Sequence, residues 1–135
     1  PLVTGEDLDV RMLTPVDWYN PHPLPPSLAL WVRANGRVDH PDSVHASLLA
    51  YFSDTLMIDV CLAATGRSFL QQNLQVASLD HALWFHAPVR ADEWLLHTVE
   101  AERVAAGRGL AHGRFFNRDG VLVASVSQQG LMRQR

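Results

Sequence analysis

The stretch that decides the fold runs from Val44 to Cys61 and reads VHASLLAYFSDTLMIDVC. Its apolar residues occur on almost every side of a helical wheel, and a helix of that kind is normally buried. A buried helix seldom contains an ionisable residue unless that residue is paired or functional. This stretch nevertheless carries a carboxylate, Asp54, in its middle. The sequence therefore predicts one long central helix whose carboxylate needs an explanation.

Residues at both ends of the stretch define where this helix begins and ends. Asp42 and Ser43 follow a proline, and either side chain could cap the free amides of the first turn. Gly66 follows Thr65 at the other end and can adopt the left-handed conformation that terminates a helix. Asp59 lies nearer that end than Asp54, and we expect it to face solvent.

The rest of the chain has the alternation and the turn residues of β-strands. We expect a linker or arm over residues 1–8 and a proline-rich loop over residues 20–26. A helix packed on one face of an antiparallel sheet makes an α+β fold, and 135 residues suit a single domain over residues 1–135. The predicted strands are Asp9–Leu13, Leu28–Ala34, Gln75–His86, Trp94–Val104, Gly109–Asn117 and Val121–Arg133.

Composition excludes several functional classes. With 47% hydrophobic and 19% charged residues the chain resembles an ordinary folded domain, and its net charge of −3 argues against nucleic-acid binding. No uncharged apolar window reaches about eighteen residues, so we expect no membrane span. The seven histidines and single cysteine lack metal-ligand spacing, and no nucleotide-binding glycine motif occurs, so we expect neither metal nor cofactor.

Two further expectations concern the cellular context of the chain. One cysteine excludes an internal disulfide, and the sequence shows no signal-peptide pattern, so we expect a cytoplasmic protein. The chain begins at Pro1 without a methionine, which suggests a fragment or a cleaved product.

Three polar residues occupy positions where they could carry chemistry. Asp54 could act as a general base in a cleft, or could lie at the rim and reach solvent. Gln128 shares a strand face with alternating apolar residues, so its amide could orient a water or hold a carbonyl oxygen, or could simply meet water near the strand end. Ser78 is a small hydroxyl that could join such a site or be satisfied by backbone.

Other polar residues are weaker candidates. Asp80 and His81 are adjacent in a predicted strand, so their side chains should point to opposite faces and cannot form a catalytic pair. Arginines at the ends of predicted elements could meet the phosphates of a nucleotide-containing substrate, although arginines in such positions are more often solvated rim charges. They are Arg67, Arg90, Arg108 and Arg133.

Several segments together resemble a known family. SLDHALWFHAPVRADEWLL (78–96) followed by DGVLVASVSQQGLMR (119–133) is similar to the C-terminal half of the acyl-CoA thioesterase II family. WVRANGRV (31–38) and VHASLLAYFSD (44–54) agree with the same half in the same order. The resemblance runs from about Val10 to Arg133.

The resemblance implies a hotdog fold, in which a curved antiparallel sheet wraps a long central helix. It also implies an enzyme that hydrolyses acyl-CoA thioesters to free fatty acid and CoA, with an Asp, Thr or Ser, and Gln triad that positions a water. The matching positions here are Asp54, Ser78 and Gln128. Serine replaces the threonine common in the family, which keeps the hydroxyl but loses the methyl group that restricts its rotamer.

The resemblance further implies a partner. Family members are tandem double hotdogs, and this chain matches only the second domain. We therefore expect acyl-CoA as substrate and a second hotdog domain as partner, supplied by an N-terminal half, a separate chain or self-association into an oligomer. Two alternatives remain open: a non-catalytic acyl-CoA-binding or structural half, and a hotdog enoyl-CoA hydratase. The hydratase is less favoured because His45 lies on a different helix face from Asp54.

Overall fold

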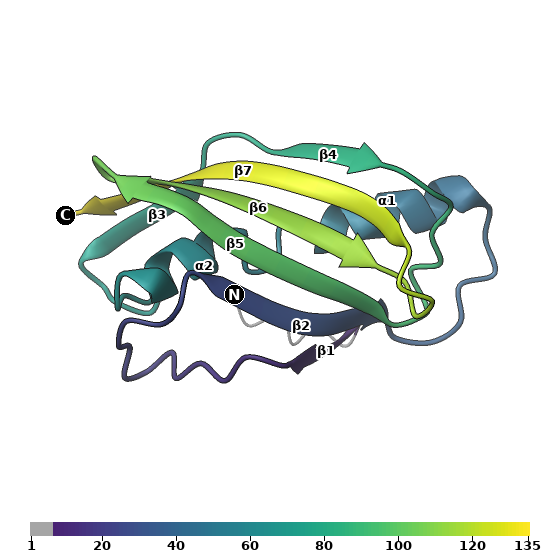
Figure 1. The fold of residues 1–135 in the computed structure, drawn as a ribbon, viewed down its shortest axis with the longest axis horizontal. Coiled ribbons are helices and arrows are strands. Elements are labelled where there is room, and N and C mark those ends of the chain that lie inside the picture. Colours follow the sequence, from purple (N-terminus) through teal and green to yellow (C-terminus); the bar gives the residue numbers. More distant parts are fainter. Residues whose placement is uncertain (1–6) are drawn as a thin grey trace.

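A computed structural model describes residues 7–135 as one antiparallel sheet curved around a helical segment, as Figure 1 shows. The strand order is β1-β2-β5-β6-β7-β3, and β4 also pairs with β7. This arrangement confirms the predicted α+β class. The elements are β1 (Leu8–Met12), β2 (Ser27–Ala34), α1 (Asp42–Phe52), α2 (Met57–Ala64), β3 (Leu74–Ser78), β4 (Ala82–Phe85), β5 (Leu95–Ala105), β6 (Arg108–Phe116) and β7 (Leu122–Gln134).

The predicted strands mostly match the observed ones. The β6–β7 hairpin has the predicted turn, and both of its strands begin within one residue of the predicted positions. At the N-terminal end, β1 begins at Leu8, which the predicted arm had included; residues 1–6 of that arm lie outside the described residues.

The sheet wraps the predicted central helix, but a turn divides that helix into two parts. α1 ends at Phe52 and α2 begins at Met57, and Leu56 between them has a left-handed φ of 65°. The turn contains three short polar side chains in succession, which compete with helical hydrogen bonding. The Ser53 hydroxyl donates to the Ala50 carbonyl at 2.6 Å. Asp54 consequently lies exposed in a turn whose other residues are buried, and not in the middle of a buried helix.

The two helix ends differ in how well the sequence predicted them. Neither Asp42 nor Ser43 caps α1, because Pro41 occupies the cap position and makes no side-chain cap hydrogen bond. Asp42 lies in the first turn, where its charge favours the helix dipole. The predicted C-terminal end is confirmed: Gly66 has a φ of 71° and its N–H donates to the Ala63 carbonyl.

A groove of glycines lets α2 lie very close to the sheet. Gly109 and Gly130 are direct partners across β6 and β7. A Cβ atom added to Gly109 would lie 2.7 Å from the Cys61 side chain, and one added to Gly130 would lie 2.7 Å from Ile58. Ordinary carbon contacts are much longer. The two missing side chains therefore set how closely α2 approaches the sheet.

The predicted strand over residues 75–86 is interrupted. β3 and β4 pair with successive parts of β7, with Ser78 opposite Gly130 and Ala82 opposite Ser127. Between them, the Asp80 carboxylate accepts hydrogen bonds from the Gln129 backbone N–H at 2.6 Å and from the Gln129 side-chain amide at 3.0 Å. These bonds fix the break and place His81 at the start of β4.

The combined helical segment Asp42–Ala64 is long and apolar enough to span a membrane by length and composition alone. However, 61% of its most apolar window is buried inside the domain. α2 packs on β5, β6 and β7, so the core of the domain accounts for its apolar character.

Candidate functional site

Ser78 and Gln128 are hydrogen-bonded to each other. Gln128 lies on the core face of β7 and is only 2% exposed, in agreement with the predicted strand phase. Its side-chain Nε2 donates to Ser78 Oγ at 2.9 Å. The pairing of Ser78 with Gly130, two residues beyond Gln128, makes this contact a diagonal one across neighbouring strands. Two of the three predicted site residues therefore lie together.

His81 joins this pair and extends it to the helical turn. Its Nδ1 lies 2.5 Å from Gln128 Oε1, and its Nε2 lies 2.7 Å from the hydroxyl of Ser53. Ser53 is fully buried, so its hydroxyl anchors the ring and is not open to a substrate. The imidazole of His81 thus connects β7 with the turn that carries Asp54.

Sequence reasoning considered His81 only as a partner for Asp80. The side chains of these two residues do go to opposite sides, because Asp80 bonds to Gln129 whereas His81 contacts Gln128. The available clue was the position of His81 before β4, since β4 pairs with the strand that carries Gln128. Without the register between β4 and β7, that clue does not identify the contact.

Asp54 borders the same region without bonding to the pair. It lines a cavity of about 400 Å³ beside α2. Among the described residues, hydrogen bonds join Ser78 to Gln128, whereas none joins Asp54 to either residue. Asp54 follows Ser53 in the chain, and Val76 in the cavity wall lies two residues before Ser78. The cavity is lined by Asp54, Ile58, Asp59, Phe69, Leu74, Val76 and Arg135.

The second carboxylate of the cavity differs strongly from the first in its surroundings. Asp59 is only 4% exposed, so the prediction that it faces solvent is wrong. Asp59 lies between Ile58 and Cys61, the two residues that pack on the glycine groove, so it belongs to the part of α2 that lies closest to the sheet. Burial raises the pKa of Asp59, and the negative charge of Asp54 raises it further. Asp54, which is exposed, is the better placed of the two to meet water.

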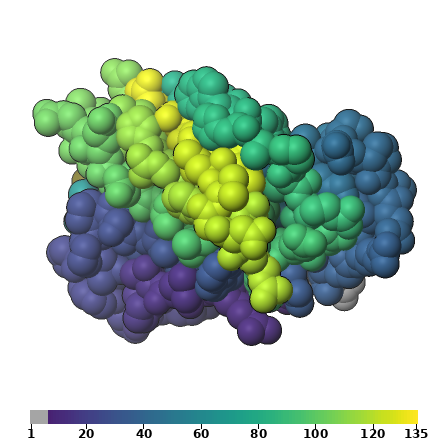
Figure 2. All heavy atoms as spheres, turned by 45° about the vertical axis from the view of Figure 1, so that its right-hand side comes forward, coloured from purple at the N-terminus to yellow at the C-terminus, as the bar shows by residue number. Residues whose placement is uncertain are grey.

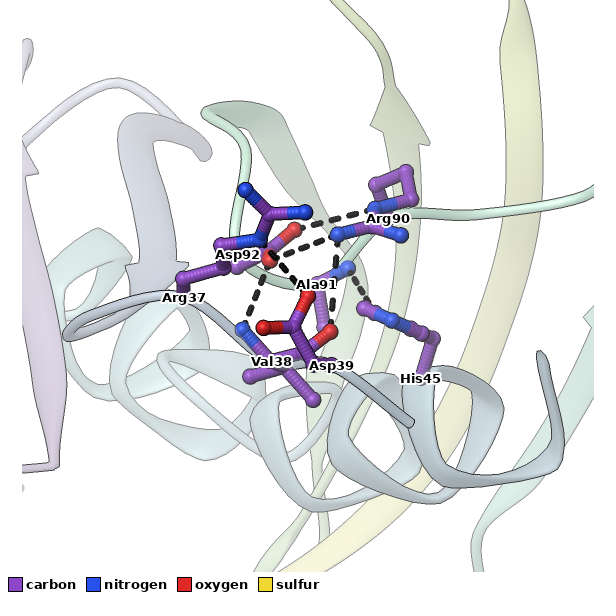
Figure 3. A network of polar contacts seen from close by, with 7 residues as sticks. All are labelled: Arg37, Val38, Asp39, His45, Arg90, Ala91 and Asp92. Atoms are coloured by element: carbon purple, nitrogen blue, oxygen red, sulfur yellow. Dashed lines mark hydrogen bonds and ion pairs between the residues drawn. The ribbon is translucent and has the colours of Figure 1, made fainter. Parts of the chain in front are cut away.

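A separate polar network lies at the start of α1, and Figure 3 shows it. The Asp92 carboxylate accepts hydrogen bonds from the Val38 N–H at 2.8 Å and from Arg90 Nη2 at 2.8 Å. Beside it, the Ala91 N–H donates to Nδ1 of buried His45 at 3.0 Å. The hydrogen bond that Arg90 donates to the Asp92 carboxylate raises the pKa of Arg90. The network ties the loop before α1 to the loop before β5 and already engages Arg90.

Comparisons with known proteins identify related chains of the same family. A family model described as acyl-CoA thioesterase matches residues 22–131. Acyl-CoA thioesterase 2 of Haemophilus influenzae is 39% identical over 115 residues, which make up 85% of this chain and 40% of that protein. An acyl-CoA thioesterase II from Mycobacterium marinum superposes with a TM-score of 0.80 at 38% identity, over 96% of this chain and 51% of that chain.

A more distant likeness concerns the fold alone. A hotdog-fold protein of Alicyclobacillus acidocaldarius superposes with a TM-score of 0.68 at 18% identity, over 96% of this chain and 46% of that one. The predicted hotdog fold is therefore confirmed. The chain spans about half the length of these two structures and 40% of the Haemophilus influenzae relative. Together, the matched residues and the shared fold show that this chain belongs to the acyl-CoA thioesterase family.

Proposed function

We propose that this chain is the acyl-CoA-hydrolysing half of a double-hotdog assembly and that it releases free fatty acid and CoA. The observation that carries the proposal is the Ser78–Gln128 hydrogen bond, linked through His81 to the turn that holds Asp54. The family match supports thioester hydrolysis as the reaction, because the relatives it includes are named acyl-CoA thioesterases.

In the proposed reaction a water molecule is the nucleophile. Asp54 accepts a proton from the water as its oxygen attacks the thioester carbonyl carbon. The carbonyl oxygen gains negative charge, and the amide N–H of Gln128 and the hydroxyl of Ser78 donate hydrogen bonds to it. Collapse of this intermediate breaks the carbon–sulfur bond, and the CoA thiolate takes up the proton held by Asp54. The products are a carboxylic acid and the CoA thiol, with no covalent acyl-enzyme.

The cavity beside Asp54 is suited to the acyl part of such a substrate. Its wall combines the carboxylates with the apolar side chains of Ile58, Phe69, Leu74 and Val76. Apolar walls with a few polar groups are typical of small-molecule sites, where the polar groups fix the orientation of the ligand. We propose that the acyl chain lies against this apolar wall, with the thioester carbonyl toward Ser78 and Gln128.

The partner of this chain is proposed to be a second hotdog domain, from an N-terminal half, another chain or self-association. Within the described residues, β4 pairs only with β7, so its other edge is free to accept a strand. Trp84 and Phe85 on β4 are 52% and 47% exposed. In Figure 2 the teal atoms of this segment lie at the surface beside the yellow-green atoms of β7. The coverage of about half of the Mycobacterium marinum and Alicyclobacillus acidocaldarius chains fits such a partner.

Thioester hydrolysis by the assembled protein tests this proposal. Thiol release from an acyl-CoA should fall about 100-fold or more in the Asp54→Asn and Gln128→Ala proteins, since each loses a group that acts only in the reaction. Asp119→Asn, a change in the exposed β6–β7 turn, is the matched control and should leave the rate unchanged. Undiminished turnover by Asp54→Asn would remove Asp54 from the mechanism.

A non-catalytic acyl-CoA-binding half is the second candidate, and one observation favours it: Asp54 makes no hydrogen bond to Ser78 or Gln128 among the described residues. This alternative predicts that the assembled protein binds acyl-CoA with an affinity that Gln128→Ala does not change. It also predicts that hydrolysis, wherever it occurs in the assembly, is unaffected by substitutions in this chain.

A further inference from the structure

We propose that His81 is a positioning residue that determines which end of the Gln128 amide faces Ser78. The inference rests on the proposed hydrolysis, because it assigns His81 the task of holding Gln128 in the orientation that the reaction uses. It starts from three contacts that meet at one ring and one amide: Nδ1 with Gln128 Oε1, Nε2 with Ser53 Oγ, and Gln128 Nε2 with Ser78 Oγ.

Counting protons shows what these contacts require of the ring. The carbonyl oxygen of Gln128 accepts hydrogen bonds and cannot donate them, so the 2.5 Å contact requires a proton on Nδ1 of His81. A neutral imidazole carries one N–H, and its other nitrogen then accepts a hydrogen bond. In that state, Nε2 accepts a hydrogen bond from the Ser53 hydroxyl, which then no longer donates to the Ala50 carbonyl. If both nitrogens are protonated, Ser53 instead donates to the Ala50 carbonyl, 2.6 Å away. Nδ1 is a donor in both cases.

The opposite tautomer would reverse the amide. With the proton on Nε2 alone, Nδ1 becomes an acceptor, and Gln128 must turn its NH₂ group toward His81. The Gln128 carbonyl would then face Ser78 and accept a hydrogen bond from the Ser78 hydroxyl. Gln128 is 2% exposed and hydrogen-bonds to the exposed side chains of His81 and Ser78, so the buried amide must present its oxygen and its NH₂ group in the order that the tautomer of the ring requires.

The two orientations differ in what they offer a developing negative charge. With Nδ1 protonated, one N–H of Gln128 donates to Ser78, and its second N–H and the Ser78 hydroxyl remain available as donors. In the reversed orientation the Gln128 carbonyl faces Ser78 and accepts a hydrogen bond from its hydroxyl, so that hydroxyl can no longer donate to the substrate. Only the first arrangement stabilises an oxyanion. His81 thus acts through Gln128, without touching the substrate.

Histidine ring ¹⁵N spectroscopy tests the tautomer without needing turnover. In the native assembly with ¹⁵N-labelled histidine, the His81 signals are identified by their absence in the His81→Leu protein. We expect Nδ1 to carry a proton at neutral pH. A ring protonated only on Nε2 would overturn the inference, whatever the protein hydrolyses. A protonated Nδ1 in a protein without thioesterase activity would instead leave the inference standing and refute the proposed function.

Kinetic rescue tests the consequence for catalysis. Asparagine places an N–H near the position of Nδ1, whereas leucine provides none, so His81→Asn should keep kcat within about tenfold and His81→Leu should lower it about 100-fold, with KM nearly unchanged. The matched control is His112, an exposed histidine on β6 whose Nδ1 lies 2.7 Å from Ser127 Oγ. His112→Leu should not change kcat. Equal losses in both His81 variants, or none in either, would overturn the inference.

Discussion

A fully buried histidine makes the stability of this domain depend on pH in a predictable way. His97 on β5 stacks on Phe115, with ring centroids 3.9 Å apart, and among the described residues neither ring nitrogen has a hydrogen-bond partner. Burial lowers the pKa of His97 from 6.5 to about 3. The unfolded chain therefore binds this proton more readily than the folded one. Stability is complete above the unfolded pKa and is lost as the pH falls from about 6.5 toward 3.

The size of the effect follows from the two pKa values. At about pH 5 the histidine of the unfolded chain is roughly 97% protonated, while His97 in the folded domain stays neutral. The free energy of unfolding should then be about 2 kcal/mol lower than at about pH 7.5, since each pKa unit contributes about 1.4 kcal/mol. At this pH the difference in free energy depends only on the pKa of the histidine in the unfolded chain, provided that the pKa of His97 in the folded domain lies well below about 5.

Urea unfolding at about pH 7.5 and about pH 5 measures this difference. The native protein should lose about 2 kcal/mol more than the His97→Phe protein, which keeps an aromatic ring on Phe115 but has nothing to protonate. Comparing the two pH values within each protein removes any packing change that the substitution causes. His40→Gln, at an exposed position before α1, is the control and should keep the native pH dependence. An unchanged pH dependence in His97→Phe would refute the reasoning.

Three further predictions concern the core and its anchors. Asp59→Asn should stabilise the domain at neutral pH and lose this advantage as the pH falls, because burial raises the pKa of Asp59 and favours its protonated form; chemical denaturation over that pH range measures it. Gly130→Ala should cost about 1–3 kcal/mol through its clash with Ile58, and adding Ile58→Ala should recover part of that loss in a double-mutant cycle. Asp92→Ala leaves the Val38 N–H without its acceptor and should lower the thermal unfolding temperature, by an amount equivalent to about 1–3 kcal/mol.

The strands and the phase of Gln128 could be predicted because they depend on local alternation. The core face of β7 continues the pattern of Ala124 and Val126, and that pattern reaches Gln128 without a break. The end of α2 was predictable for a similar reason, since a glycine such as Gly66 adopts the left-handed conformation easily, whatever its tertiary surroundings. In both cases the information lies within a few residues of the feature.

The turn between α1 and α2 could not be predicted in the same way. Apolar residues continue on both sides of Ser53 and Asp54, so helical periodicity runs through the break. Leu56 adopts a left-handed conformation that leucine rarely takes, and its burial among core residues favours that conformation. The burial of Asp59 accompanies the packing of α2 on glycines of β6 and β7, and the contact of His81 with Gln128 depends on a strand register. These are tertiary effects that no local window contains.

The glycine groove has a consequence for how this domain can vary. Gly130 lies two residues from Gln128, and Ile58, which covers it, lies four residues from Asp54. A side chain added at Gly130 or Gly109 would have to displace Ile58 or Cys61 of α2, and a shift of α2 away from the sheet would widen the space between the carboxylate and the amide of the candidate site. The domain can tolerate such a shift as a loss of packing, whereas the proposed chemistry depends on short distances. In a mutational scan, substitutions at these two core glycines should therefore behave like substitutions at site residues. Activity should fall while folded protein still accumulates.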